Sequence, residues 1–263
     1  MHSSLLVNEP SYSNEIAQDE ALDAIDPLRH FRTAKDDFDV HVKEPYLIPV
    51  QPRSVIDEVI QLSFPEKPID GSQQVTVSLV VDASPGCGGV AWPAGEVLAN
   101  YIATRGSNYI KGRKILELGS GTGLVGLVAG ALGGEVQITD QAPLLGIMRR
   151  NVDMNRLQAS VAVSELNWGE RLSSEISQPD LILAADCVYF EPAFPLLVET
   201  LSALATCENT EILFCYKKRR KADKRFFALL KKKFTWREVD DDPNRDGYTR
   251  EAISLLTLSR RIR

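Results

Sequence analysis

From residue 74 onward the apolar positions of the chain follow two alternating periods. Short apolar or alternating runs predict strands, and longer segments with apolar residues three or four apart predict helices. The predicted strands are 75–81, 114–118, 135–139, 161–166, 181–185, 211–215, 235–239 and 252–258. The predicted helices are 92–102, 124–132, 144–155, 194–205 and 221–233. Strands separated by helices of this length indicate an α/β fold with a mostly parallel sheet and helices on both faces.

The last two predicted strands have no predicted helix between them. A short link, 240–248, joins 235–239 to 252–258. A link of this length suits an antiparallel pair, so the sheet should end in one antiparallel edge strand.

The first 72 residues differ from the rest in composition, charge and apolar periodicity. They hold seven prolines and fourteen acidic against six basic residues, while the net charge of the whole chain is −6. They also lack a sustained apolar period, which is typical of segments that do not pack a core. We therefore predict a partly disordered acidic extension, 1–72, and a folded domain, 73–263. A solvated tail and a docking arm both remain open for the extension.

Composition limits the class of protein. The 263 residues are 44% hydrophobic, and no apolar run reaches the about 18 residues of a membrane helix. Four scattered cysteines without a C-x-x-C pair, and three histidines near the N-terminus, argue against a disulfide framework or a metal site. An acidic chain also argues against stable nucleic-acid binding. We expect a reduced, soluble, cytoplasmic monomer.

A glycine-dense turn follows the strand 114–118. Gly119, Gly121 and Gly123 alternate with polar residues, and a helix-forming segment begins at Leu124. Glycine lets backbone amides approach a ligand closely, and a helix N-terminus favours negative groups. The turn therefore predicts a site for a nucleotide-like cofactor.

Two cofactors compete for this turn. The segment 121–126 satisfies the G-x-G-x-x-G pattern of nicotinamide enzymes, although that pattern alone is weak evidence. Glu117, placed two residues before Gly119, suits S-adenosylmethionine better, because an acid can bind its ammonium while glycine amides bind its carboxylate. A buried, purely structural acid is the alternative for Glu117.

Other candidate side chains follow later strands. Asp140 ends the strand 135–139 and could accept hydrogen bonds from ribose hydroxyls, or could cap a helix instead. Trp168 follows 161–166 and could pack on an adenine ring or belong to the core. Asp186 and Tyr189 follow 181–185, at the strand ends where open α/β sheets place their chemistry.

Four motifs together resemble those of the seven-β-strand protein-lysine methyltransferases. They are 92–95 (WPAG), 116–123 (LELGSGTG), 166–169 (LNWG) and 185–189 (ADCVY), in the order that this family shows. The resemblance covers roughly 75–260 and implies a Rossmann-like seven-stranded sheet that binds S-adenosylmethionine. It implies that the residues lining the cofactor are Trp92, Gly119, Ser120, Gly121, Asp140, Trp168, Ala185 and Tyr189. Asp186 and Tyr189 match the signature at the lysine entrance.

Within the family, further segments are similar to fungal enzymes that methylate a lysine of translation elongation factor 1-alpha. These are 86–89 (GCGG), 183–189 (LAADCVY), 191–197 (EPAFPLL) and 216–224 (YKKRRKADK). The resemblance implies a protein-lysine N-methyltransferase acting on that factor. A lysine methyltransferase of another protein, such as an AAA ATPase, and a cofactor-binding module without catalysis are the alternatives.

The expected chemistry gives Asp186 and Tyr189 roles. A lysine amine must lose its proton before methylation, which near neutral pH costs about 4 kcal/mol for a pKa of about 10.4. We hypothesise that Asp186 captures and orients the charged lysine while Tyr189 lines the alkyl channel or accepts a hydrogen bond.

A basic run occupies 217–233. It has ten bases and one acid, Asp223. A solvated helix face and a docking surface for an acidic protein patch or RNA are both compatible with it.

Overall fold

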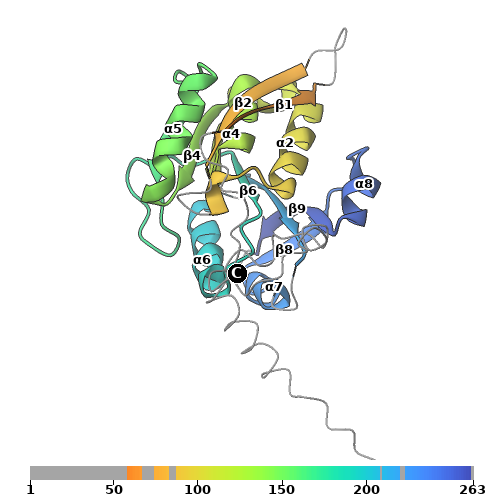
Figure 1. Ribbon diagram of the computed structural model, residues 1–263. Helices are drawn as coiled ribbons and strands as arrows, with labels where there is room; N and C mark the ends of the chain where they lie inside the picture. The colour runs from red at the N-terminus through yellow and green to blue at the C-terminus, as the bar shows by residue number, and fades with distance from the viewer. Residues whose placement is uncertain (1–57, 67–73, 83–86, 208, 220–222, 262–263) are drawn as a thin grey trace, which may run out of the picture. The chain divides into compact units, whose positions relative to one another are not determined.

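The computed structural model describes residues 58–66, 74–82, 87–207, 209–219 and 223–261 (Figure 1). Its main sheet has seven strands in the order β5-β4-β3-β6-β7-β9-β8. Their bounds are β3 Lys114–Leu118, β4 Glu135–Asp140, β5 Val161–Glu165, β6 Leu181–Ala185, β7 Glu211–Lys217, β8 Phe234–Glu238 and β9 Ile253–Arg260. Each falls on a predicted strand, and the predicted α/β class is confirmed.

One strand of the main sheet is reversed. β9 pairs antiparallel with both β7 and β8, whereas the other pairings are parallel. The reversed strand therefore lies one position in from the edge, and the edge itself is β8. The link that was predicted to lack a helix contains a short one, α8 (Arg245–Arg250). The antiparallel pairing of the last two strands is as predicted.

Helices cover both faces of the main sheet. They are α2 Pro93–Arg105, α3 Ser107–Ile110, α4 Leu124–Ala131, α5 Leu145–Met154, α6 Phe194–Leu204 and α7 Asp223–Leu230. Successive strand residues enter opposite cores: in β7, Leu213 packs toward α2 and α4, and Phe214 packs toward α6 and α7. Among the described helices, none is long and apolar enough to cross a membrane.

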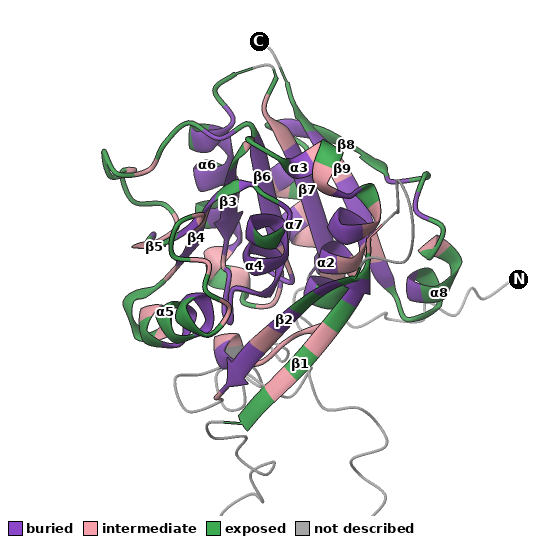
Figure 2. Cartoon of the chain, turned by 90° about the horizontal axis from the view of Figure 1, so that it is seen from above, coloured by how far each residue is buried: buried purple, intermediate pink, exposed green. Residues whose placement is uncertain are grey.

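A two-stranded hairpin lies on the outer side of α2, α4 and α5. It consists of β1 (Glu58–Pro65) and β2 (Gln74–Val81), paired antiparallel. Figure 2 shows β2 buried over much of its length and β1 alternating between exposed and half-buried positions. β1 falls inside the predicted extension, so the folded domain begins before residue 73. Residues 1–57 lie outside the described residues.

Two asparagines, Asn151 of α5 and its C-cap residue Asn155, complete the backbone pairing of β2. The Asn151 side chain accepts from the Val80 N–H (2.6 Å) and donates to the Val80 carbonyl (3.1 Å). One helical turn later, Asn155 makes the same pair of bonds with Ser78. Side chains four residues apart on the helix thus lie opposite backbone groups two residues apart on the strand. They supply the hydrogen bonds that a neighbouring strand would otherwise make on this side of β2.

Asn151→Ala is expected to lower the free energy of unfolding by about 2 to 4 kcal/mol. The substitution leaves buried polar groups of Val80, and the Thr122 carbonyl that Asn151 also contacts at 2.9 Å, without partners. Urea unfolding followed by circular dichroism measures the change. The control Asn108→Ala alters an exposed asparagine of α3; equal stability of the two variants would contradict this role.

Candidate functional site

The turn between β3 and α4 adopts a conformation that favours glycine. Gly119 has a φ of 59° and Gly121 a φ of 56°, in the left-handed region. A Cβ at Gly121 would lie 2.5 Å from the Gly88 carbonyl oxygen, because the segment before α2 passes directly over the turn. A Cβ at Gly119 would lie 2.9 Å from the Trp168 ring. The predicted alternation of glycines is therefore required by both conformation and space.

Asp140 ties the end of β4 to this turn. Its Oδ2 accepts from the Gly121 N–H (2.8 Å) and its Oδ1 from the Gln141 N–H (2.7 Å). Burial raises the pKa of Asp140, and these two donors oppose that effect. The helix-cap alternative finds no support, since these donors are a turn amide and the next residue. Each oxygen retains a lone pair that could accept from a hydroxyl.

Ser120 joins the strands β3 and β4 at their carboxyl ends. Its Oγ accepts from the Thr139 N–H (3.0 Å) and donates to the Glu117 carbonyl (3.2 Å). The residue is 7% exposed. These contacts hold the two strand ends in register and direct the hydroxyl into the protein.

The Glu117 carboxyl is buried against the first turn of α4. Its Oε2 accepts from the Gly126 N–H (2.9 Å), and the residue is 2% exposed. A side chain at Gly126 would exclude this carboxyl, since a Cβ there would lie 2.8 Å from Oε2. Burial raises the pKa of Glu117 to about 8, which its amide and Ser120 hydrogen bonds only partly offset. The sequence left two interpretations of Glu117 open, a ligand of the cofactor ammonium and a buried structural acid. This geometry supports the structural acid.

Two tryptophans lie beside the turn. Trp168 is half-buried after β5 and packs against Gly119. Trp92 is the N-cap residue of α2, whose first turn approaches the start of α4 through Gly95 and Leu124. Trp168 therefore lies at the strand end where the sequence placed it, whereas Trp92, which only the family resemblance put at the site, is brought toward α4 by the packing of α2.

The carboxylate of Asp186 forms a buried ion pair. Oδ1 and Oδ2 each lie 2.7 Å from a different terminal nitrogen of Arg219, and Oδ1 also accepts from the Lys217 N–H (3.1 Å). The side chains of Arg219 and Asp186 are 6% and 4% exposed. Asp186 itself has a φ of 56°, which is uncommon outside glycine and asparagine. The bidentate pair fixes the carboxylate at the end of β6.

Hydrogen bonds attach the segment after β6 to the neighbouring strands β7 and β3. Ala185 ends β6, and the Asp186 N–H donates to the Cys215 carbonyl of β7 (2.8 Å). The Cys187 Sγ donates to the Leu118 carbonyl (3.3 Å). Burial raises the pKa of Cys187 well above its usual value, so this thiol is not a nucleophile. Tyr189 is half-buried in the segment that follows.

The predicted site residues converge because they follow the carboxyl ends of adjacent parallel strands. The turn follows β3, Asp140 ends β4, Trp168 follows β5 and Asp186 follows β6. Sequence reasoning missed Arg219, which was placed within the basic run. Its position two residues after the end of β7 was the available signal, because β7 is the next strand along the same edge.

Comparison with known proteins decides the family. The model of the lysine methyltransferase family matches residues 72–233. The chain belongs to this family. The chain is 42% identical to the protein-lysine N-methyltransferase EFM6 of Saccharomyces cerevisiae, over 67% of this chain and 82% of that protein. It is 41% identical to the protein N-lysine methyltransferase METTL21A of Danio rerio, over 64% of this chain and 78% of that protein.

A solved structure shares the fold of this lysine methyltransferase. The 16S rRNA N2 G1207 methyltransferase of T. thermophilus, solved with S-adenosylmethionine and guanosine, aligns with a TM-score of 0.52 and 17% identity. The alignment covers 76% of this chain and 51% of that one. At this identity the likeness concerns the arrangement of strands and helices.

As a member of the family, the chain is an enzyme, a protein-lysine N-methyltransferase that depends on S-adenosylmethionine. The nicotinamide alternative and the non-catalytic module are thereby set aside. The residues at the carboxyl ends of the parallel strands fit this cofactor. The glycines of the turn leave its backbone open to close approach, and Asp140 keeps acceptor capacity beside it. The half-buried Trp168 ring stands against Gly119.

The raised pKa of Glu117 gives a test by protein stability. Between the unfolded pKa of 4.5 and the folded pKa of about 8, the folded state binds more protons, so stability is greatest at low pH and is lost as pH rises. From pH 5.5 to 8 this group alone should lower the free energy of unfolding by about 3 kcal/mol. Glu117→Gln should remove that component, as urea unfolding at both pH values would show. The exposed Glu135→Gln is the control, and an equal pH dependence in wild type and Glu117→Gln would contradict the assignment.

Proposed function

We propose that this lysine methyltransferase methylates translation elongation factor 1-alpha. The support is the resemblance of 86–89, 183–189, 191–197 and 216–224 to the fungal enzymes with that substrate. Described residues of three of these segments lie beside the strand ends: Gly88 lies against the glycine turn, and Asp186 pairs with Arg219. A cytoplasmic location follows from this proposal, because translation elongation takes place there.

The roles proposed for the cofactor-binding residues follow their positions. Gly119 and Gly121 would let the carboxylate end of S-adenosylmethionine approach the backbone of the turn closely. The Gly121 N–H itself already donates to Asp140, whose remaining lone pairs would accept from the ribose hydroxyls. Trp168 would pack on the adenine ring. The remaining lining of the cofactor site would come from Trp92, Ala185 and Tyr189. The turn is held from the protein interior by the hydrogen bonds of Ser120 and Glu117.

Bound S-adenosylmethionine supplies an electrophilic methyl group on a positively charged sulfur. The protein must therefore present a neutral lysine amine in line with that group. We propose that Asp186 orients the entering amine through the remaining lone pair of Oδ2, while Tyr189 lines the alkyl part of the lysine. Asp186 and Tyr189 thus keep the roles that the sequence suggested.

Arg219 changes what Asp186 does to the proton of the lysine. A lone carboxylate would stabilise the ammonium form and raise the pKa of the lysine. The guanidinium balances that charge at 2.7 Å, so the pair orients the amine without holding it protonated. Arg219 is in this proposal a positioning residue that acts through Asp186.

The substrate proposal is tested by mass spectrometry of elongation factor 1-alpha from cells that lack this protein. One lysine of the factor is expected to lose its methyl groups, and purified enzyme with labelled S-adenosylmethionine is expected to restore them. An unaltered methylation pattern would refute this substrate.

Asp186→Asn should lower kcat/KM by about 100-fold or more, since the amine loses its orienting group.

The role of Arg219 is tested by the pH profile of kcat at saturating substrate, which reports the pKa of the lysine in the enzyme–substrate complex. In Arg219→Met the uncompensated carboxylate favours the ammonium form, so the rise of kcat with pH should move upward by about one pH unit. Arg219→Lys keeps the charge and should return the rise toward its wild-type position. Initial rates with labelled S-adenosylmethionine between pH 6.5 and 10 measure both. Equal losses at every pH in both variants would mean that Arg219 is only structural.

A further inference from the structure

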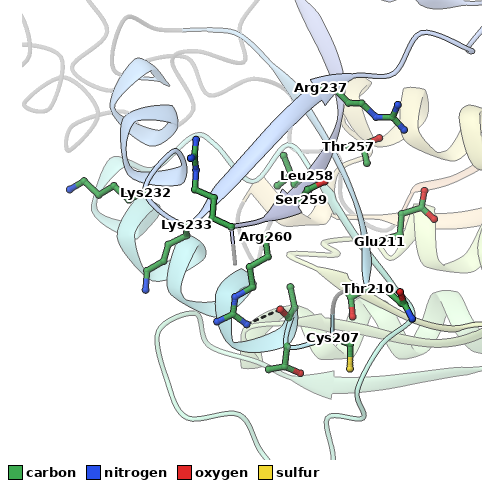
Figure 3. Close-up of a pocket in the computed structure, with 14 residues that line it drawn as sticks. Cys207, Thr210, Glu211, Lys232, Lys233, Arg237, Thr257, Leu258, Ser259 and Arg260 are labelled. Atoms are coloured by element: carbon green, nitrogen blue, oxygen red, sulfur yellow. Dashed lines mark hydrogen bonds between the residues drawn. The ribbon is translucent and has the colours of Figure 1, made fainter. Parts of the chain in front are cut away.

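A basic recess lies at the edge of the main sheet opposite the glycine turn. It has a volume of about 880 Å³ and is lined by residues at the amino end of β7, the carboxyl end of β9 and the connection from α7 to β8 (Figure 3). Its charged lining residues are Lys232, Lys233, Arg237, Arg260, Arg261 and Glu211. Five cations therefore face one acid, in a protein whose net charge is −6.

The positive charges of the recess are not balanced within the described part of the chain. Glu211 is engaged by Arg113 at 3.0 Å, outside the set of lining cations. Arg260 donates to the Ala205 carbonyl (2.8 Å) and Arg261 to the Phe234 carbonyl (3.2 Å), bonds that position a guanidinium without neutralising it. Among the described residues no acid forms an ion pair with any of the five cations.

The spacing of the cations points to an extended anionic ligand. Lys233 immediately precedes β8 and Arg237 is the fourth residue of that strand, so their backbones are separated by up to about 13 Å. A single small anion would contact both side chains only if these bent toward each other. A segment with several acidic residues can contact both without such bending, because an extended backbone rises by about 3.3 Å per residue.

The remaining lining favours a protein over a nucleic acid. The hydroxyl groups of Thr257 and Ser259 line the recess and can donate to carboxylates, whereas those of Thr206 and Thr210 already donate to Gln178 and to the Pro179 carbonyl. Aromatic rings, on which bases stack in single-stranded nucleic-acid sites, do not occur among the described lining residues.

We propose that this basic recess docks an acidic segment of the protein substrate while the lysine is presented at the opposite edge. The seven residues of β7 separate the two edges by about 20 Å, a distance that a folded protein substrate can span. The proposal deepens the proposed function, because it assigns substrate capture to a surface remote from methyl transfer. A small-molecule substrate would have no use for it.

The first test is direct binding of a fluorescently labelled octaglutamate peptide to the full-length chain. Lys233→Glu with Arg237→Glu reverses two lining charges. The matched control, Lys224→Glu with Lys231→Glu, reverses two exposed charges of the same basic run that do not line the recess. The lining pair should weaken binding by about tenfold or more, and the control much less. Thermal unfolding of both variants checks that they fold alike.

Three outcomes of this experiment are informative. Selective loss in the lining variant, with binding that weakens as salt is raised, supports the proposal. Equal loss in both variants overturns it in favour of a diffuse electrostatic effect. A labelled oligouridylate that binds more tightly than the peptide, and is lost in the same variant, overturns it in favour of RNA.

Kinetics separate this proposal from the proposed substrate. With elongation factor 1-alpha and labelled S-adenosylmethionine, the lining variant should show a KM raised about tenfold and an unchanged kcat, because the catalytic edge is intact. Unchanged KM would overturn the docking proposal alone. Absence of methylation by the wild-type enzyme would refute the substrate instead, and leave the peptide measurement to decide the recess.

Discussion

The turn after β3 keeps its shape through side chains of other elements. The turn satisfies only part of its own backbone, through the bond from the Gly123 N–H to the Ser120 carbonyl, and buried polar groups without partners are costly. Asp140 at the end of β4 receives the Gly121 amide, and Asn151 of α5 donates to the Thr122 carbonyl. Ser120 joins the turn to Thr139. The cofactor edge is therefore defined jointly by β3, β4 and α5, and a shift of any one would displace the turn.

The periodic elements were predictable because their burial is regular. β3, β6 and β7 alternate between two cores, and the helices present apolar stripes to one of them. β1 was not predicted, since its residues are largely exposed and lie among prolines and acids. α8 was missed for a similar reason: its six residues, RDGYTR, bury Tyr248 alone and show no apolar period. The place of β9 between β7 and β8 depends on long-range pairing that local sequence does not encode.

The candidate site was predictable as far as its residues follow strand ends. Topology alone brings the glycine turn, Asp140 and Asp186 to one edge. The function of each side chain depended on tertiary contacts. Glu117 turned inward because a glycine at 126 leaves room for its carboxyl. Arg219 resembles its basic neighbours in sequence, and its burial against Asp186, 33 residues away, distinguishes it.

The hairpin strand β1 has a consequence for any shortened form of this protein. The family match begins at residue 72, so a fragment designed from that boundary would lack β1. One side of β2 is satisfied by α5, but the other would then present a row of free backbone donors and acceptors bordered by valines. Exposed strands of this kind recruit further strands from other molecules. Such a fragment would tend to precipitate or form oligomers even with every catalytic residue intact.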